Sequence, residues 1–544
     1  MLKLPLDMLY HWEKTTPTAV YLRQPINGVY QEYSWAQTAK IVRSLATALQ
    51  QLNMPKGAKV AIWSKNCAEW IMADLAIMMA GYVSVPIYFT ANAQTIAYVL
   101  EHSESQAIFI GKLDNLHEGL PAIAPHITRL AFPYENVPNA TNWAQMLAQP
   151  PLKGEPQREA QEVMSIVYTS GSTGKPKGVV DTFFAYASAC AAFERVIPAT
   201  NKERVMSYLP LAHITERVVV EGSSFYKGYS LSFVESLDSF QANVKAVQPT
   251  MFLSVPRLWT RFQMGILAKL PQKKLDLLLS IPLVKTLVAR KIRRELGLDS
   301  ATVFGSGSAP LSAATIRWYQ RLGIHICEGW GMSESNGLGT VSYPFRDDKV
   351  GSIGRPQNPQ GVRISAEGEI QVKGDNLMKE YYKDPEQTAA AYTDDGWFKT
   401  GDKGSIDSEG YIRITGRLKE IFKTAKGKYV APVPIEALLM ENSFIEQVCV
   451  TGNNLKQPIA LVVLAPEAQQ IERAQLSASL EHTLDAVNAR LESHELLDAL
   501  VIVKDSWSAE NGLLTPTLKI KRSEVENAYQ ALINQAHNQR IQFA

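Results

Sequence analysis

One stretch constrains this sequence more than any other: residues 168–179, Y-T-S-G-S-T-G-K-P-K-G-V, which directly follow the apolar run 163–167. The apolar run predicts a buried strand that leads into a loop of small residues, hydroxyls and lysines. Gly171, Gly174 and Gly178 allow the backbone turns that bring N–H groups close to an oxyanion. Hydroxyl donors and positive charges come from Thr169, Ser170, Ser172, Thr173, Lys175 and Lys177. Together these groups predict a polyphosphate site.

Two alternatives to this interpretation are weaker. The loop does not fit the Walker A pattern G-x-x-x-x-G-K-[ST], because its spacing differs and Pro176 follows Lys175. A flexible Gly/Ser linker between domains would contain the same small residues. Linkers, however, rarely combine a preceding core strand with threonines and an ordered Lys-Pro-Lys-Gly sequence. We therefore expect a phosphate loop of a kind other than Walker A.

Composition indicates a large globular protein around this loop. The chain has 544 residues, of which 46% are hydrophobic and 20% charged, so it can bury a sizeable core. At ~150 residues per unit, this length suggests three or four structural blocks. A net charge of +2 and the lack of a long basic tract argue against nucleic acid as a partner.

The sequence predicts no redox site and no membrane span. The cysteines are too far apart for a C-x-x-C site and are expected to be small buried apolar residues in a reducing cytoplasm. They are Cys67, Cys190, Cys327 and Cys449. The N-terminus lacks the pattern of a signal peptide. The longest apolar tract, 70–89, contains Asp74, Gly81 and Pro86, which favours a core helix followed by a strand. We expect a cytoplasmic protein, either soluble or peripherally bound to the inner membrane surface.

Strands and helices alternate over most of the chain. Apolar strands are predicted at 58–63, 82–88, 107–110, 205–209, 230–234, 251–255 and 302–305. Helices are predicted between them, at 67–80 among others, so we expect parallel sheets covered by helices on both faces. Residues 134–162 are interpreted as a polar connection into the phosphate loop. The helix 183–193 is expected to open at the end of that loop and to direct its positive N-terminal dipole at a bound anion.

The character of the sequence changes from about residue 350. Short strands at 362–364, 369–372 and 411–414, separated by Gly and Asn/Asp turns, predict a small antiparallel sheet or barrel. The charged sequence 416–420 then leads into a terminal α+β block. The predicted fold class is α/β, with parallel sheets sandwiched by helices. We expect a large N-terminal domain, 1–416, with a β-barrel-like subdomain at about 345–416, a hinge at 417–420 and a smaller mobile α+β domain at 421–544.

The phosphate loop resembles the signature of the adenylate-forming (AMP-binding) superfamily, which includes acyl-CoA synthetases, peptide-synthetase adenylation domains and luciferases. This string is specific for the superfamily, and it does not identify the acid. Five further motifs resemble those of the family and occur in the family's order. Several are worded most like the long-chain fatty acyl-CoA synthetases, so the chain is identified as similar to that subgroup.

The second and third motifs concern the acid and the adenine. Residues 209–217, L-P-L-A-H-I-T-E-R, resemble the motif whose histidine, here His213, borders the acyl carboxylate. A histidine after a strand is otherwise more often a hydrogen-bonded structural residue. Residues 304–311 resemble the turn that packs on the adenine, although many members have Gly-Gly or Gly-Glu where this chain has Ser-Gly-Ser. The implied contacts are Gly307, Ser308, Ala309 and Pro310.

The fourth motif, residues 328–334, reads E-G-W-G-M-S-E. An aromatic ring between glycines can stack on a purine, and a carboxylate four residues later can ligate Mg²⁺, which prefers oxygen ligands. The alternative is a tight turn around a core tryptophan. The family pattern is Tyr-Gly-x-Thr-Glu, so Trp330 and Ser333 depart from it, while Glu334, the implied Mg²⁺ ligand with Thr169, is retained. The implied nucleotide contacts are Glu328, Gly329, Trp330, Gly331, Met332 and Ser333.

The last two motifs surround the predicted hinge. Asp402 and Arg417 resemble the ribose-binding Asp and Arg of the family, although each could also be a turn former or a solvated charge. The resemblance places the hinge residue at Lys419, and we assign Gly427 to the thioester step. Residues 511–522 align Lys519 with the family's mobile catalytic lysine. Since Leu518 replaces the usual glycine before it, Lys521 is the alternative. The implied catalytic residues are Lys519, Glu334, Thr169 and His213.

The resemblance implies a ligase that uses ATP, Mg²⁺ and coenzyme A. The acid first attacks the α-phosphate to give acyl-AMP and pyrophosphate, and the thiol of coenzyme A then displaces AMP. A long-chain fatty acid is the favoured substrate. The alternatives are a medium-chain or aryl acid, transfer to a carrier-protein thiol, a luciferase-like oxygenase and an inactive acyl- or nucleotide-binding homologue. A homodimer is left open.

Residues 266–296 are not explained by these motifs. They mix Leu, Ile and Val with a cluster of Arg and Lys. Such a mixture is consistent with a basic amphipathic surface that contacts anionic lipid. The alternative is a helix pair on the large domain with a solvated basic face.

Overall fold

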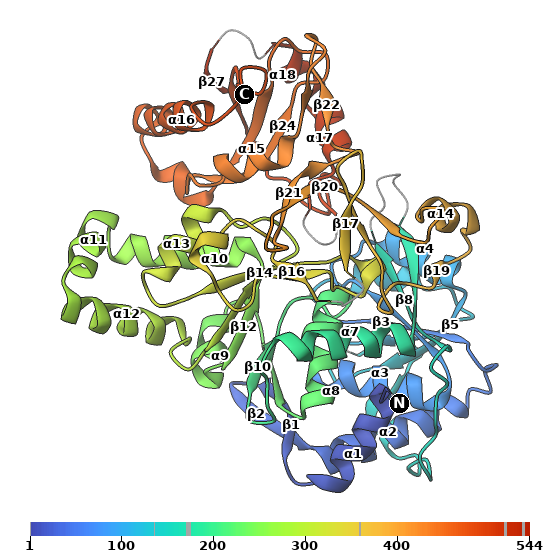
Figure 1. Ribbon diagram of the computed structural model, residues 1–544. Helices are drawn as coiled ribbons and strands as arrows, with labels where there is room; N and C mark the ends of the chain where they lie inside the picture. The colour runs from blue at the N-terminus through green and yellow to red at the C-terminus, as the bar shows by residue number, and fades with distance from the viewer. Residues whose placement is uncertain (1, 135, 170–175, 358–360, 516–518, 536–538) are drawn as a thin grey trace.

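The computed structural model describes residues 2–134, 136–169, 176–357, 361–515, 519–535 and 539–544. Most of the chain forms one large body, and the residues after β21 (Ile412–Arg417) form a smaller body against one end of it (Figure 1). Both bodies combine sheets with helices, so the predicted α/β class is confirmed. Within these residues, the structure contains no helix with the length and apolar character needed to cross a bilayer.

An eight-stranded sheet forms the centre of the large body, with the order β19-β9-β8-β4-β3-β5-β6-β7. Its strands are β3 (Lys59–Trp63), β4 (Val83–Ile87), β5 (Ser105–Ile110), β6 (Thr128–Ala131), β7 (Thr141–Asn142), β8 (Val163–Thr169), β9 (Lys177–Thr182) and β19 (Glu380–Tyr381). From β8 to β7 neighbouring strands are parallel, as predicted. β9 and β19 add an antiparallel edge, which the sequence interpretation missed because residues 177–182 were taken as the end of the loop.

The prediction that the helix at 183–193 begins at the end of the phosphate loop is wrong. Strand β9 lies between that loop and helix α7 (Phe183–Val196). β8 and β9 form a hairpin in which Thr169 pairs with Lys177 beside the loop. Thr182, the N-cap of α7, pairs with Val163 at the opposite end of that hairpin. A strand of this length spans about 20 Å. The positive end of the helix dipole is therefore too far from the loop to act on an anion bound there.

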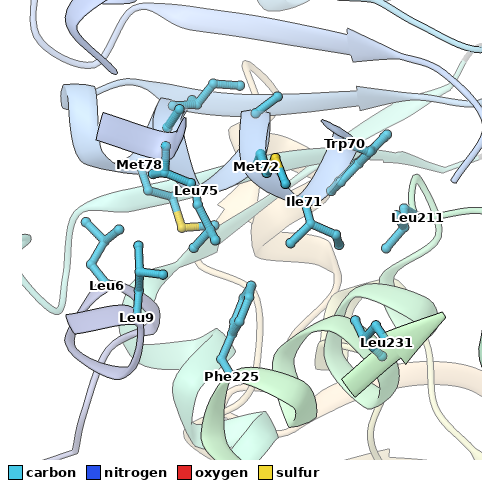
Figure 2. Close-up of a cluster of buried hydrophobic side chains, with 14 of the residues drawn as sticks. Leu6, Leu9, Trp70, Ile71, Met72, Leu75, Met78, Leu211, Phe225 and Leu231 are labelled. Carbon is cyan, nitrogen blue, oxygen red and sulfur yellow. The ribbon is translucent and has the colours of Figure 1, made fainter. Parts of the chain in front are cut away.

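Helix α3 (Ala68–Ala80) forms the core beside this sheet, and all of its residues before Ala80 are buried. Figure 2 shows its side chains packed over Leu6 and Leu9 of α1 and Phe225 of α8. The other helices of the large body are α1 (Pro5–Thr15), α2 (Trp35–Gln50), α4 (Ala93–Ser103), α5 (Leu116–Gly119), α6 (Trp143–Leu147), α8 (Ser223–Lys227), α9 (Phe240–Val247), α10 (Pro256–Lys269), α11 (Gln272–Ser280), α12 (Pro282–Leu296), α13 (Ala313–Gln320) and α14 (Pro385–Ala390). β7 and α6 lie in the predicted connection 134–162, where they were missed because such short elements show no periodicity. All four cysteines are buried free thiols, as expected.

Two further sheets complete the α/β part of the large body, with the orders β10-β11-β1-β2 and β12-β13-β14-β15-β16. Their strands are β1 (Val20–Ile26), β2 (Val29–Ser34), β10 (Arg204–Ser207), β11 (Ser230–Phe233), β12 (Met251–Ser254), β13 (Val303–Ser306), β14 (Ile326–Trp330), β15 (Thr340–Val341) and β16 (Arg355–Pro356). The strands predicted at 205–209, 230–234, 251–255 and 302–305 are present, with ends that differ by one or two residues. β10, β13 and β14 end at three of the predicted motifs.

The β-rich segment forms a four-stranded antiparallel sheet, as predicted, from β17 (Val362–Ile364), β18 (Glu369–Val372), β20 (Phe398–Ile406) and β21. The smaller body is an α+β unit. Its strands are β22 (Phe422–Lys423), β23 (Tyr429–Val430), β24 (Ile445–Thr451), β25 (Ile459–Leu464), β26 (Leu500–Val503) and β27 (Ile541–Phe543). Its helices are α15 (Pro432–Leu439), α16 (Arg473–Asn488), α17 (Arg522–Ala528) and α18 (Gln530–Gln535). The hinge at 417–420 and the mobility of this body stay predictions.

Candidate active site

The loop end of the β8–β9 hairpin, where Thr169 and Lys177 lie, is beside the turn that carries Glu334. Thr169 and Lys177 pair across the hairpin, and the Lys177 ammonium sits 5.2 Å from the ring centre of Tyr381. The Tyr381 hydroxyl in turn donates a hydrogen bond to Oε1 of Glu334 over 2.8 Å. Burial and the charge of Glu334 raise the pKa of Tyr381, which keeps its hydroxyl a donor. The two predicted Mg²⁺ ligands, Thr169 and Glu334, thus belong to one neighbourhood.

Most of the predicted phosphate loop cannot be placed in this way. Ser170, Gly171, Ser172, Thr173, Gly174 and Lys175 lie outside the described residues. Tyr381, in contrast, is a site residue that the sequence interpretation missed. It belongs to the two-residue strand β19, which pairs with β9 at Val179. A strand of that length gives no recognisable sequence signal.

The Glu334 turn is held rigidly to the β8–β9 hairpin. Gly331 begins it with no room for a side chain, since a Cβ would lie 2.2 Å from the carbonyl oxygen of Gly337. The Asn336 side-chain amide donates to Oδ1 of Asp181 on β9 over 3.0 Å. The Met378 N–H donates to the carbonyl oxygen of Glu334 over 2.8 Å. The turn that carries Glu334 is therefore joined to strand β9 and to the segment before β19.

Asp402 accepts a hydrogen bond on each of its oxygens. Nε of Arg417 donates to Oδ1 and Nε1 of Trp330 donates to Oδ2, both over 2.9 Å. Asp402 and Arg417 are opposite each other in the β20–β21 ladder, which sets their distance. Burial alone would lower the pKa of Arg417, but the charge of Asp402 and the hydrogen bond to it outweigh that effect and raise the pKa. The predicted ribose pair is thus a formed ion pair oriented by the predicted purine-stacking residue.

The third and fourth motifs also lie against each other. A Cβ on Gly307 would be 3.1 Å from the carbonyl oxygen of Gly329, so these two backbones are in close contact. Ser308 adopts a left-handed conformation with φ of 67° and is exposed, as are Ala309 and Pro310. Glu328 is turned to the other side, where its carboxylate accepts from the backbone N–H of Leu311 over 3.4 Å. Burial raises the pKa of Glu328 to about 7 despite that hydrogen bond.

The side chain of Trp330 is half-buried. One face of its ring is covered by Gly339, where a Cβ would lie 2.5 Å from the indole. Met332 and Trp330 both pack against the small apolar cluster around Tyr381 and Phe398. Ser333 opens the single 3-10 turn that carries Glu334. Trp330 is therefore a packed residue beside a tight turn, as the alternative expected, and its stacking on a purine stays a prediction.

His213 lies in the loop after β10, where its Nδ1 accepts a hydrogen bond from the backbone N–H of Thr215 over 3.3 Å. Burial, together with the nearby positive charge of Lys519, lowers the pKa of His213 to about 4. The imidazole is therefore neutral at physiological pH, and with Nδ1 as acceptor its proton resides on Nε2. A neutral Nε2–H group can donate to a carboxylate oxygen.

Lys519 is the residue through which the smaller body interacts with this site. Its charge acts on His213, Arg417, Asp402 and Glu334. The Lys519 side chain is exposed at the surface, and the desolvation caused by the protein packed near it, together with the charge of Arg417, lowers its pKa.

Three other residues were predicted to act from the hinge or the smaller body: Lys521, Lys419 and Gly427. Lys521 directly precedes helix α17, and its backbone N–H donates to the carbonyl oxygen of Leu513. Lys419 is exposed, and its charge acts on Lys177. Gly427 has a φ of 77° in the exposed turn between β22 and β23. The structure thus places Lys519 and Lys419 near the candidate site and Gly427 on an outer turn of the smaller body.

A fully buried charge cluster, missed from the sequence, lies behind the site. Nη2 of Arg217 donates to Oδ2 of Asp74 over 2.6 Å, and its Nε is 3.5 Å from Glu221. Nη1 of Arg217 also donates to Ser165 of β8 over 2.5 Å. The single guanidinium of Arg217 balances the charge of one carboxylate, Asp74. The neighbouring acids are buried without a full counter-charge, and burial raises the pKa of Glu221 and raises that of Asp181 to about 8. Arg217 lies in a π-helix, Glu216–Gly222, that follows His213.

Comparison with known proteins gives a consistent result. The family model described as AMP-binding enzyme matches residues 9–382, and the model of the AMP-binding enzyme C-terminal domain matches residues 420–540. The long-chain-fatty-acid–CoA ligase FadD15 of Mycobacterium bovis is 28% identical over 98% of this chain and 96% of its own. The fatty acyl-CoA synthetase A of Dictyostelium discoideum is 30% identical over 93% of this chain and 86% of its own.

Solved structures share the fold at lower identity. The adenylation domain of a carboxylate reductase from Mycobacterium chelonae is 20% identical, with a TM-score of 0.84 over 98% of this chain and 91% of that one. The anthranilate CoA ligase AuaEII in complex with anthranoyl-AMP is 19% identical, with a TM-score of 0.81 over 98% of each chain. At these identities the likeness establishes the fold and leaves the acid undetermined.

Proposed function

The chain belongs to the family of AMP-binding enzymes and is an adenylate-forming ligase, and from this premise we propose that it joins a long-chain fatty acid to coenzyme A. The observation that carries the proposal is the hydrogen-bonded set of Asp402, Arg417 and Trp330, on which the charge of Lys519 from the smaller body acts. The full-length relatives named for long-chain acids support the choice of substrate.

In the first half-reaction, a carboxylate oxygen of the acid bonds to the α-phosphorus of ATP while the bond from that phosphorus to the pyrophosphate oxygen breaks. Anion meets anion in this step, so positioning and charge neutralisation supply most of the acceleration. We assign the bridge between the carboxylate and the α-phosphate to Lys519. The Nε2–H of neutral His213 would hold the second carboxylate oxygen and so orient the attacking one.

The nucleotide would be held by groups that are already formed. Each oxygen of Asp402 has one protein donor and keeps acceptor capacity for a ribose hydroxyl. The remaining N–H groups of Arg417 can donate to the same sugar. Gly307 to Pro310 would lie along the adenine, and Lys177 with residues 169–175 would bind the phosphates.

The residues present fit a Mg²⁺ ion bound with the nucleotide. Across the described residues, no three or more His, Cys, Asp or Glu side chains gather into a metal cage. Mg²⁺ at nucleotide sites is usually held by one or two protein oxygens, with phosphates and waters as the other ligands. Glu334, with one oxygen engaged by Tyr381, and Thr169 are such a pair. The ion would neutralise charge on the phosphates.

In the second half-reaction, the thiol loses its proton, its sulfur bonds to the acyl carbon, and AMP leaves. We propose that the smaller body rotates about Lys419 between the two steps, which withdraws Lys519 and brings the turn at Gly427 to the acyl group. The division into residues 1–416, 417–420 and 421–544 is part of this proposal. An inactive binding homologue is disfavoured because Lys519, Glu334 and Asp402 are all retained.

The decisive measurement is AMP release that depends on ATP, Mg²⁺ and coenzyme A, with acids from acetate to oleate and with benzoates. The proposal expects the highest kcat/KM for a long-chain fatty acid. Faster turnover of a benzoate or a medium-chain acid would replace the substrate and keep the adenylation. Pyrophosphate exchange into ATP without AMP release on addition of coenzyme A would indicate a carrier-protein thiol as acceptor. Absence of exchange with every acid would overturn the proposal.

A further inference from the structure

Helices α11 and α12 project from the side of the large body, at the left edge of Figure 1. Their inner faces are packed, because Leu275 and Leu279 of α11 and Ile292 and Leu296 of α12 are buried in a core shared with α9 and α10. A helix pair with one packed face is thus present, as one sequence interpretation expected. Its outer face, here called the α11–α12 tip, is defined by residues 273–287.

The tip exposes an unusual amount of apolar surface. Leu277, Ile281, Leu283 and Leu287 are exposed by 65, 45, 83 and 70%. They are four of the ten large hydrophobic side chains exposed among the described residues, and they fall within eleven residues of sequence. Single exposed leucines need no explanation, but a contiguous group marks an interaction surface. Leu283 and Leu287 are one helical turn apart and so share a face of α12.

Positive charge accompanies this apolar surface. Lys273 and Lys274 precede Leu277 by four and three positions and therefore lie on its side of α11. Lys285 lies between Leu283 and Leu287 in sequence. The lysines are exposed, and none is within ion-pair distance of an acidic side chain in the described part of the chain. They are therefore free to bind a negatively charged surface.

The acidic groups nearby are neutralised within the protein. Asp276 pairs with Arg321 over 2.6 Å, and Glu295 pairs with Lys245 over 2.9 Å. Asp299 is surrounded by three arginines of α12, Arg290, Arg293 and Arg294. The tip therefore combines exposed leucines with lysines that have no acidic partner among the described residues, and Asp276, the acidic residue within it, is paired with Arg321.

We propose that the α11–α12 tip docks on an anionic lipid bilayer. The leucines would enter the boundary between headgroups and acyl chains, and the lysines would contact lipid phosphates. Charge favours this occupant over a second copy of the chain, since a symmetric contact would set the same lysines against each other. The inference goes beyond the proposed ligase activity and involves none of the site residues.

Vesicle flotation without substrates tests the proposal. The intact protein should float with vesicles of phosphatidylglycerol mixed with phosphatidylcholine and much less with phosphatidylcholine alone. High salt should release it, since the screening length falls from about 10 Å at 0.1 M to about 3 Å at 1 M. Lys273→Gln with Lys274→Gln should weaken binding on the order of tenfold or more, at about fivefold per lysine. Leu283→Asn with Leu287→Asn should weaken it to a similar degree.

Matched controls are available on other surfaces. Leu237 is 87% exposed and Lys153 is exposed, so Leu237→Asn and Lys153→Gln should leave flotation unchanged. The lysine variant remains decisive if the leucine variant fails to fold, as checked by thermal melting. Failure of the wild type to float with anionic vesicles, or equal flotation of the tip variants, would overturn the proposal. Light scattering that shows a dimer lost in the tip variants would assign the surface to a second copy instead.

Discussion

Nε1 of Trp330 donates a hydrogen bond to Oδ2 of Asp402 over 2.9 Å. The bond joins β14 to β20, two strands from different sheets. Because Arg417 holds the other oxygen, the carboxylate cannot rotate without breaking one of the two bonds. Trp330 therefore orients the proposed ribose ligand in addition to offering a ring beside it.

Trp330→Phe keeps an aromatic ring and removes this donor. A hydrogen bond to a charged group contributes about 1.5–3 kcal/mol, so we expect the KM for ATP to rise at least about tenfold, with a smaller change in kcat. Discrimination between ATP and 2′-deoxy-ATP should also fall, which a general loss of packing would not cause. Pyrophosphate exchange with ATP and with 2′-deoxy-ATP measures both the KM and this discrimination. Trp397→Phe, outside the site, is the control, and an unchanged KM would contradict the role of Trp330.

Lys519→Ala should separate the two half-reactions. Removing the positive charge of Lys519, which acts on Asp402 and Glu334, should reduce pyrophosphate exchange by 100-fold or more, on the order of the ~2.7–4 kcal/mol typical of one transition-state donor. Thioester formation from supplied acyl-AMP should persist. Lys521→Ala is the matched control and should retain both steps. The reverse pattern would move the catalytic role to Lys521.

Lys419→Pro should have the opposite effect. Proline fixes φ and removes an N–H group, so it restricts rotation at the proposed hinge while leaving the present arrangement intact. We expect pyrophosphate exchange to remain and thioester formation from supplied acyl-AMP to fall. A parallel assay of Lys153→Pro, in an exposed loop of the large body away from the hinge, controls for general damage. Equal loss of both steps in this variant would refute the hinge at Lys419.

The sequence was most informative where a strand is long and apolar. The parallel strands around β8 and the helix at 67–80 follow from such runs, and the motifs that end β10, β13 and β14 indicated most of the site. β9 was missed because a strand that begins with Lys-Gly looks like a loop. Helix α7 was then placed at the wrong end of that strand, which shows how one unrecognised edge strand reverses an electrostatic argument.

Contacts between distant residues could not be predicted. Arg217 and Asp74 are separated by 143 positions, and each could be read alone as a surface charge or an exception in an apolar helix. Only the packing of α3 against the π-helix brings them together. The same holds for Tyr381 and Glu334, since nothing in a two-residue strand indicates its partner. Such contacts depend on the topology of the fold, which cannot be read from a single sequence.

Asp181→Asn should stabilise the protein at high pH and leave it unchanged at low pH. Burial raises the pKa of Asp181 to about 8, against the effects of Arg217 and the Asn336 hydrogen bond. The unfolded chain ionises this group near 3.8, so the native state loses stability as pH rises from about 4 to 8. Asparagine removes this loss, which for a pKa raised from 3.8 to about 8 is on the order of 6 kcal/mol above pH 8 at 1.36 kcal/mol per pH unit.

Thermal melting of Asp181→Asn and the wild type at pH 5 and pH 8 measures this effect. The difference in melting temperature should be large and positive at pH 8 and much smaller at pH 5, where only the first part of the loss has occurred. The control Asp347→Asn, on an exposed turn, should leave the melting temperature unchanged at both pH values. Destabilisation at pH 8 would show that Asp181 is ionised beside Arg217 and that the buried cluster holds a second carboxylate charge.

Lys519→Ala should also raise the pKa of His213. Burial is the larger cause of the lowered pKa, about 4 against an ordinary 6.5, and the charge of Lys519 is the second, so removing that charge moves the pKa upward without restoring it fully. Since the unfolded chain binds this proton more readily, His213 reduces stability as pH falls from 6.5 toward 4. Nuclear magnetic resonance can follow the imidazole signal that is absent from His213→Gln. Lys521→Ala should leave the titration in place, and an unchanged value in Lys519→Ala would show that Lys519 does not face His213 in solution.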